Sequence, residues 1–140
     1  MFVVLDTNHY RELIHETSLG EHLMQRLDAS DADVFTTIVT AQEITEGWSA
    51  ELNRRRAGRD QVHAYGLFLI ALKAFERITI LPFDDDAAEH FHRLQSLRPR
   101  IGTMDLKIAA ITMSHSALLL TRNLSDFAKV PELRVENWLD

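Results

Sequence analysis

The stretch of sequence that decides the fold is FVVLDTN, residues 2–8, in which four apolar residues lead directly into a carboxylate, a hydroxyl and an amide. A short, unbroken apolar run is typical of a strand that is buried on both faces, as in a parallel sheet. A charge at the end of such a strand costs free energy unless something compensates for it. Asp6 therefore raises the question of which group compensates its charge at the carboxyl end of the first strand.

The remainder of the chain predicts strands that alternate with helices. Four further segments are apolar or rich in β-branched residues and predict strands at 33–38, 78–83, 117–121 and 133–138. Helical spacing of apolar residues, caps and turn signals predict helices at 9–28 with a break at Gly20, and at 40–56, 61–77, 84–97 and 104–115. This alternation indicates a parallel α/β sheet in one domain that spans residues 1–140.

The composition excludes several classes of protein. Apolar residues make up 46% of the 140 residues, which suffices for a sizeable core, and the absence of cysteine excludes disulfides and thiolate metal sites. No N-terminal signal is visible, and the longest apolar stretch, residues 65–75, is shorter than the roughly 20 residues of a membrane span. We therefore expect a soluble, cytoplasmic protein with no membrane partner. The net charge of −6 argues against binding nucleic acid by bulk charge, although a local basic patch would suffice.

Four acidic residues are expected at one edge of the sheet. Ligands of open α/β sheets bind beyond the carboxyl ends of the strands, and four acids of this sequence fall there: Asp6, Glu43, Asp105 and Asp126. Taken singly, each has a structural explanation. Asp6 and Asp126 suit turns or caps, Glu43 would complete a capping box with Thr40 as the N-cap, and Asp105 would compensate a helix dipole.

The combination of four carboxylates is harder to explain by structure alone. Two carboxylates about 5 Å apart repel each other by roughly 3 kcal/mol at an effective dielectric constant near ~20. Hard divalent cations such as Mg²⁺ or Mn²⁺ bind oxygen ligands and would relieve the repulsion. We therefore expect Asp6 to stay charged in order to hold such an ion. The seven histidines are scattered and predict no rival zinc site.

Five motifs follow one another along the chain: LDTN (5–8), QE (42–43), IGTMDLKIAAI (101–111), LLLTRNLSDF (118–127) and VPELRVENW (130–138). This ordered set resembles a PIN domain, and more narrowly the VapC-type toxins of bacterial toxin–antitoxin pairs. The resemblance covers essentially the whole chain. It implies a three-layer α/β/α fold around a five-stranded parallel sheet of order 3-2-1-4-5. It also implies a metal-dependent endoribonuclease that uses Mg²⁺ or Mn²⁺ and leaves 5′-phosphate and 3′-hydroxyl ends.

The same resemblance implies roles for individual residues. The acidic quartet of the family corresponds to metal-binding and catalytic residues at four positions: Asp6, Glu43, Asp105 and Asp126. The small polar residue after the first acid corresponds to Thr7 or Asn8, and the polar position after the fourth strand corresponds to Asn123. Glu46, one turn beyond Glu43, is a less favoured substitute for it.

Basic and apolar residues suggest contacts with RNA and with protein partners. Arg98, Arg100 and Arg122 are close in sequence to the predicted acids and are candidates for phosphate contact, whereas the arginines at 54–59 are expected to be solvated. The helix at 61–77 is apolar nearly all round and is expected to be buried, either within the monomer or under a partner segment in an apolar groove. The resemblance implies a homodimer bound by a small VapB-like antitoxin.

Two other functions compete with this interpretation. A receiver-like phosphoryl-transfer domain also gathers acids at strand ends, but it needs a lysine after its last strand, and Lys129 is poorly placed for that role. A catalytically inactive PIN-like protein-binding module is the principal alternative. An Asp6→Asn substitution without any consequence would favour that module, whereas the intact set of acids argues for an enzyme.

Overall fold

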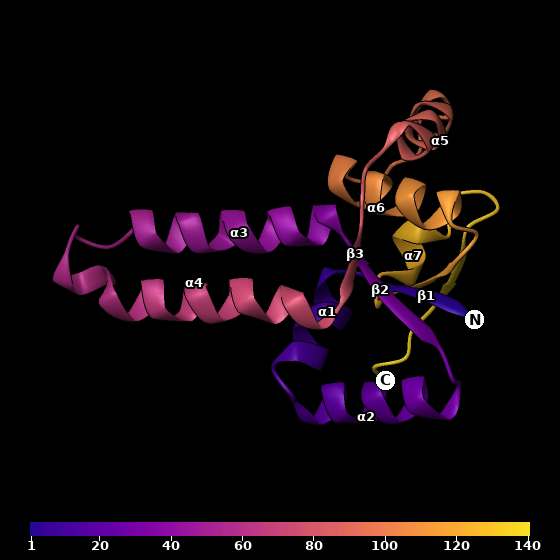
Figure 1. Ribbon diagram of the computed structural model, residues 1–140. Coiled ribbons are helices and arrows are strands. Elements are labelled where there is room, and N and C mark those ends of the chain that lie inside the picture. Colours follow the sequence, from indigo (N-terminus) through magenta and orange to yellow (C-terminus); the bar gives the residue numbers. More distant parts are fainter.

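A single five-stranded parallel sheet forms the centre of the protein in the computed structural model, which describes residues 1–140. Its order is β3-β2-β1-β4-β5, which confirms the predicted architecture. The strands are β1 (Phe2–Leu5), β2 (Asp33–Thr37), β3 (Thr79–Leu81), β4 (Leu118–Leu120) and β5 (Arg134–Glu136). Helices cover both faces of the sheet, as Figure 1 shows.

Seven α-helices connect the strands. They are α1 (Thr7–Ile14), α2 (Ser18–Ala29), α3 (Ile38–Asn53), α4 (Val62–Ala74), α5 (Asp85–Ser96), α6 (Thr103–Ser114) and α7 (Leu124–Phe127). Two short 3-10 helices, η1 (Arg59–Gln61) and η2 (Phe75–Arg77), flank α4. None of these helices combines the length and the apolar character that crossing a membrane requires.

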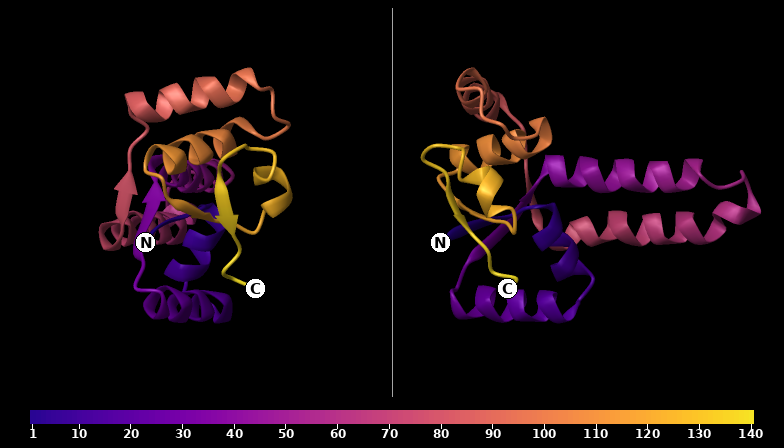
Figure 2. Two further views of the ribbon diagram at one scale, coloured as in Figure 1. Left: turned by 90° about the vertical axis from the view of Figure 1, so that its right-hand side faces the viewer. Right: turned by 180° about the vertical axis from the view of Figure 1, so that it is seen from behind.

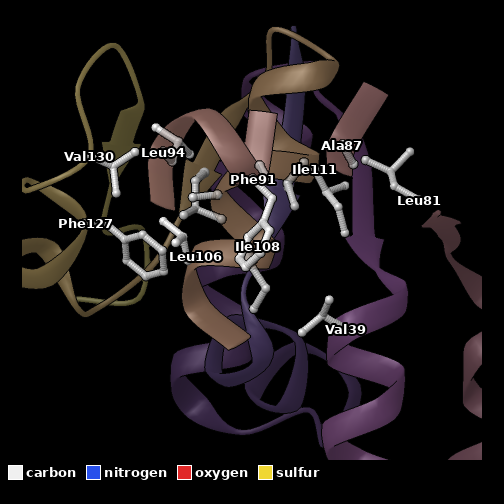
Figure 3. Packing of buried hydrophobic residues seen from close by; sticks show 14 of the residues in the cluster. Val39, Leu81, Ala87, Phe91, Leu94, Leu106, Ile108, Ile111, Phe127 and Val130 are labelled. Carbon is white, nitrogen blue, oxygen red and sulfur yellow. The ribbon is translucent and has the colours of Figure 1, made fainter. Parts of the chain in front are cut away.

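The buried apolar residues form two clusters, one on each face of the sheet. Alternation along β1 sends Val4 into one cluster and Val3 and Leu5 into the other, which explains why this strand is apolar throughout. The first cluster packs α5 and α6 against the sheet, with Phe91 and Ile108 among its labelled members in Figure 3. The second cluster packs α1 and α2 on the opposite face, which Figure 2 shows from two further sides.

Helices α3 and α4 form a hairpin that projects from the body of the molecule (Figures 1 and 2). Trp48 stacks on Phe68 with ring centroids 6.5 Å apart, and Gly58 at the tip has a φ of 103°, which favours glycine. The expectation that the 61–77 helix is buried within the monomer is wrong. Only Ala64 and Ala74 of α4 are buried, and most of its large apolar side chains face solvent.

Two predicted helix boundaries are also wrong. The 9–28 segment breaks between α1 and α2 at residues 15–17 rather than at Gly20, which is buried inside α2. Helix α3 is capped by Thr37, whose hydroxyl accepts a hydrogen bond from the backbone N–H of Thr40 at 3.2 Å. Thr40 therefore lies in the first turn of α3 and is not the N-cap, so it forms no capping box with Glu43.

Candidate functional site

The carboxyl ends of β1, β2 and β4 bring polar residues from distant parts of the chain to one edge of the sheet. The first residue after β1 is Asp6, α3 follows β2 and carries Glu43, and α7 follows β4 and carries Asp126. Asp105 lies in the first turn of α6. The negative charges of Glu43, Asp6 and Asp126 all act on the Asp105 carboxyl, so the four predicted acids share this edge of the sheet.

Asp6 is held in a fixed orientation by the first turn of α1. Its Oδ1 accepts a hydrogen bond from the backbone N–H of His9 at 2.8 Å, which makes Asp6 the N-cap of that helix. The same Oδ1 lies 3.2 Å from Nδ1 of the His9 ring. The turn explanation for Asp6 is therefore correct, and it leaves Oδ2 available to a ligand. One carboxylate oxygen of Asp6 thus caps helix α1, and the other can bind a ligand of the site.

Sequence reasoning gave no role to His9, which is fully buried beside Asp6. Its position three residues after an N-cap aspartate was the available signal, because that spacing returns a side chain to the same helix face. Nε2 on the far side of the ring lies 3.3 Å from the backbone nitrogen of Trp138. His9 thus connects the first acid of the site to the C-terminal segment.

Glu43 is oriented by two buried threonines. The Thr7 hydroxyl donates to Glu43 Oε1 at 2.9 Å and lies 3.0 Å from the Thr40 hydroxyl. Since the single hydroxyl proton of Thr7 goes to Glu43, Thr40 is the donor to Thr7. Thr40, which was predicted as a cap, is therefore part of a hydrogen-bonded chain that ends on the carboxylate.

Asp105 is the acid with the most unfavourable surroundings. Burial raises the pKa of its carboxyl, and the negative charges of Glu43, Asp6 and Asp126 raise that pKa further. No hydrogen bond from a protein donor to this carboxylate offsets the effect. Asp105 therefore lacks the compensation that each of the other three acids receives from a neighbouring side chain or backbone donor.

Asp126 is stabilised in its charged form by two neighbours. The amide of Asn123 donates to Asp126 Oδ2 at 2.9 Å, and Nζ of Lys129 lies 3.3 Å from Oδ1. The hydrogen bond from Asn123 lowers the pKa of Asp126, and the ammonium of Lys129 lowers it further. Asn123, predicted as a polar support residue, thus contacts the fourth acid directly.

The remaining predicted residues form no hydrogen bond or ion pair with the side chains of the four acids. Asn8 is exposed, and Glu46 is bound by Gln42 at 2.9 Å on the outer side of α3. Arg98 and Arg100 are exposed in the loop before α6, where the carbonyl of Arg100 accepts a hydrogen bond from Lys129 at 3.0 Å. Arg122 forms an ion pair with Asp140, with 2.6 Å between Nη2 and Oδ1.

The acids suit a hydrated cation better than a fully enclosed one. No three histidine, aspartate or glutamate side chains are gathered closely enough to hold a metal ion by themselves. Mg²⁺ usually keeps several of its waters and binds to proteins through only one or two carboxylates. Oxygen donors such as Asp6 Oδ2 and the uncompensated Asp105 carboxylate fit an ion of this kind.

Comparisons with known proteins agree on one family. The sequence matches the PIN domain family model over residues 3–133. It is 25% identical over 123 residues to the tRNA(fMet)-specific endonuclease VapC of Salmonella typhimurium, covering 84% of this chain and 85% of that protein.

Solved structures agree with this assignment. VapBC-5 of Mycobacterium tuberculosis, a member of the VapBC family of toxin–antitoxin systems, is 30% identical over 97% of this chain and 96% of that chain, with a TM-score of 0.64. VapBC2 of Rickettsia felis, bound to a DNA fragment from its promoter, has a TM-score of 0.75 over 99% of both chains at 22% identity, which supports the fold.

Proposed function

The chain belongs to the PIN-domain family, and from this premise we propose that it is an endoribonuclease and the toxin of a VapBC-type toxin–antitoxin pair. The observation that supports the proposal is the presence of four acids at the carboxyl edge of a parallel sheet, where the charges of three of them act on Asp105. The likeness to the Salmonella typhimurium endonuclease and to the Mycobacterium tuberculosis VapBC-5 structure supports it independently.

The reaction that we propose is hydrolysis of an RNA phosphodiester bond. Water adds to phosphorus, the bond to the 3′-oxygen breaks, and the products carry a 5′-phosphate and a 3′-hydroxyl. Asp6 and Asp105 would bind a hydrated Mg²⁺ or Mn²⁺ directly, and Glu43 and Asp126 would act on that ion through its water ligands. The ion would activate water and offset the charge that develops on the phosphate oxygens. Thr7 and Asn123 would keep two of these carboxylates oriented before substrate arrives.

The protein's acidic character requires local cationic groups for RNA binding. Arg98 and Arg100 are exposed next to the first turn of α6, which carries Asp105, and are the phosphate contacts that we propose. Arg122 lies after β4 but is neutralised by Asp140, so its contribution depends on that ion pair opening.

A groove between α1, α3 and α4 suits the antitoxin. It has a volume of about 660 Å³ and mostly apolar walls, which include Trp48, Leu67 and Ile70. Tyr10 lines this groove, and its buried hydroxyl has no hydrogen-bond partner. Burial raises the pKa of Tyr10 to about 12, so the hydroxyl stays protonated. We propose that an apolar segment of the antitoxin fills the groove and offers an acceptor to Tyr10.

The decisive experiment compares wild type with Asp6→Asn and Asp105→Asn in bacteria and with purified protein and RNA. Wild type should arrest growth and cleave RNA, chelation should abolish cleavage, and Mg²⁺ or Mn²⁺ should restore it. Asp31→Asn is the matched control, because Asp31 is an exposed acid before β2 at the opposite edge of the sheet, with a φ of 49° that asparagine tolerates. Equal toxicity of all four proteins would refute the nuclease and favour a protein-binding module.

A further inference from the structure

We propose that His9 is a positioning residue, which holds Asp6 through one ring nitrogen while the other is fixed by the C-terminal segment. This inference rests on the proposed function, since it concerns how Asp6 is presented to a divalent ion. The ring is fully buried and both of its nitrogens are within hydrogen-bond distance of a partner. The ring joins Asp6 to a segment that is 129 residues away from His9 in sequence.

The geometry fixes which nitrogen carries the proton. Trp138 offers its backbone N–H to Nε2 at 3.3 Å, and a backbone N–H can only donate. Nε2 is therefore the acceptor, and the ring proton of the neutral imidazole is on Nδ1. That nitrogen lies 3.2 Å from Asp6 Oδ1 and donates to it.

The C-terminal segment is itself firmly packed, so it can serve as an anchor for the ring. Trp138 and Leu139 are both buried, and Trp138 belongs to the cluster that packs α1 and α2 on the sheet. The guanidinium of Arg26 lies 4.7 Å from the centroid of the Trp138 ring. The indole donates to Glu136 at 3.3 Å.

As a consequence, the two carboxylate oxygens of Asp6 have different roles. Oδ1 accepts both the backbone N–H and the ring N–H of His9. Because both donors act on one oxygen, the carboxylate cannot rotate without losing two hydrogen bonds. Oδ2 accepts no hydrogen bond and is the oxygen that we assign to a cation. Groups that orient a metal ligand in this way commonly change metal affinity by about 10–100-fold when they are removed.

Two substitutions separate the two contacts of the ring. In His9→Asn the side-chain amide replaces Nδ1, so the donor to Asp6 is kept and the acceptor for Trp138 is lost. In His9→Gln the amide reaches the position of Nε2, so the acceptor is kept and the donor is lost. Mn²⁺ binding to each purified protein is measured by calorimetry, and RNA cleavage is measured as a function of Mn²⁺ concentration.

We expect His9→Gln to weaken Mn²⁺ binding by about tenfold and to lower cleavage at limiting Mn²⁺, with recovery at saturating Mn²⁺. His9→Asn should stay within about twofold of wild type in the same measurements. Leu23→Val is the control for a general loss of stability, because Leu23 is fully buried in the same apolar cluster and does not contact Asp6. It should lower the melting temperature without changing Mn²⁺ affinity.

A further measurement does not depend on metal. Nitrogen-15 NMR of the imidazole in metal-free wild type should report the tautomer with the proton on Nδ1. The proton on Nε2, equal Mn²⁺ affinity of both His9 variants and wild type, or an equal loss in both variants would overturn the positioning role and leave the nuclease proposal intact. Wild type that neither binds Mn²⁺ nor cleaves RNA would instead overturn the proposed function and the inference with it.

Discussion

Asp105 contributes a carboxylate to the candidate site, and the same charged carboxylate lowers the stability of the fold. Its raised pKa means that the folded protein binds this proton more tightly than the unfolded chain does. The stability that follows from the raised pKa is therefore present at low pH and is lost as pH rises through the folded pKa. At neutral pH the charged carboxylate destabilises the metal-free protein.

We therefore predict that Asp105→Asn raises the free energy of unfolding of the metal-free protein at pH 7 by up to about 1 kcal/mol. The gain should disappear below the ordinary Asp pKa of 3.8, where the wild-type carboxyl is also neutral. Urea unfolding at a series of pH values measures the difference in the free energy of unfolding between the variant and wild type. Added Mg²⁺ should stabilise wild type and not the variant, and a variant that is less stable than wild type at pH 7 would contradict the prediction.

Arg122 illustrates a second effect at the scale of single residues. Hydrogen bonds from Arg122, which has the larger effect, and from Asn137 lower the pKa of Asp140 to about 2, so the pair stays ionised at physiological pH. We predict that Asp140→Asn frees Arg122 and tightens RNA binding by about two- to fivefold at low salt. Fluorescence anisotropy with a labelled oligonucleotide measures it. The Arg122→Gln, Asp140→Asn double variant should lose the gain, and a gain that persists would assign it to another residue.

The four acids could be named from the sequence because Asp6, Asp105 and Asp126 lie within three residues of a strand or helix end and Glu43 lies in the second turn of the helix that follows β2, so the topology fixes their locations. The supporting contacts could not be predicted. Whether Thr7 donates to Glu43 or to solvent depends on the rotation of α1 relative to α3, which no local pattern encodes. The contact between His9 and Trp138 joins the two ends of the chain, and only the folded sheet brings them together.

At the scale of elements, the boundaries of helices depend on neighbours as much as on local signals. Glycine usually weakens a helix, but Gly20 lies inside α2, where it lets the backbone of α1 approach closely. A Cβ at this position would lie 1.9 Å from the carbonyl oxygen of Glu12 in α1. Thr37 is β-branched and lies between two other β-branched residues, Thr36 and Ile38, which favours strand, and its hydroxyl nevertheless caps α3. The strand and the helix share this residue, which is why the predicted cap was displaced by three residues.

The close approach at Gly20 gives a prediction at this scale. Gly20→Ala should destabilise the protein by about 1–3 kcal/mol, because the backbone of α1 must move to accept the methyl group. Thermal or urea unfolding measures the change. The matched control is Gly66→Ala in the exposed middle of α4, where a Cβ meets nothing within 4 Å. It should stabilise the protein by roughly 0.5–1 kcal/mol, and equal effects of the two substitutions would contradict the steric argument.

The cap of α3 gives another prediction. Thr37→Ala removes the acceptor for the backbone N–H of Thr40 and should cost about 1 kcal/mol of stability, whereas Thr37→Ser keeps that acceptor and should cost less. Since the first turn of α3 carries Thr40, which donates to Thr7 beside Glu43, Thr37→Ala should also reduce RNA cleavage. Unchanged unfolding free energy in Thr37→Ala would show that the cap contributes nothing.

At the scale of the whole molecule, the α3–α4 hairpin presents two distinct apolar faces. Leu67 and Ile70 line the groove next to α1. A second set of exposed residues follows the three-and-four spacing of a coiled-coil seam along α4: Val62, Tyr65, Leu69 and Leu72. Exposed apolar surface of this extent marks interaction sites, so we expect the groove to receive the antitoxin and the outer seam to join two copies of the chain.

These two faces can be tested with matched substitutions. Leu69→Glu should shift a dimer towards monomer by at least about tenfold in dissociation constant, whereas Ile70→Glu should weaken antitoxin binding and leave dimerisation intact. Analytical ultracentrifugation and calorimetry measure the two effects. Both side chains are more than half exposed, at 53% and 64%, so each variant should keep its folding stability within about 0.5 kcal/mol. A reversed pattern would exchange the two assignments.

The place of β1 in the sheet has a consequence for how the protein is made. This strand leaves the ribosome first, yet it is central, and its register with β4 pairs Val3 with Leu118. Asp105 and Asp126 are therefore translated after Asp6, with a delay of about 5–20 s at usual elongation rates of ~5–20 residues per second. A chain that terminates before Asp105 lacks two of the four acids, so we expect it to be inactive. An antitoxin made at the same time would have this interval in which to fold.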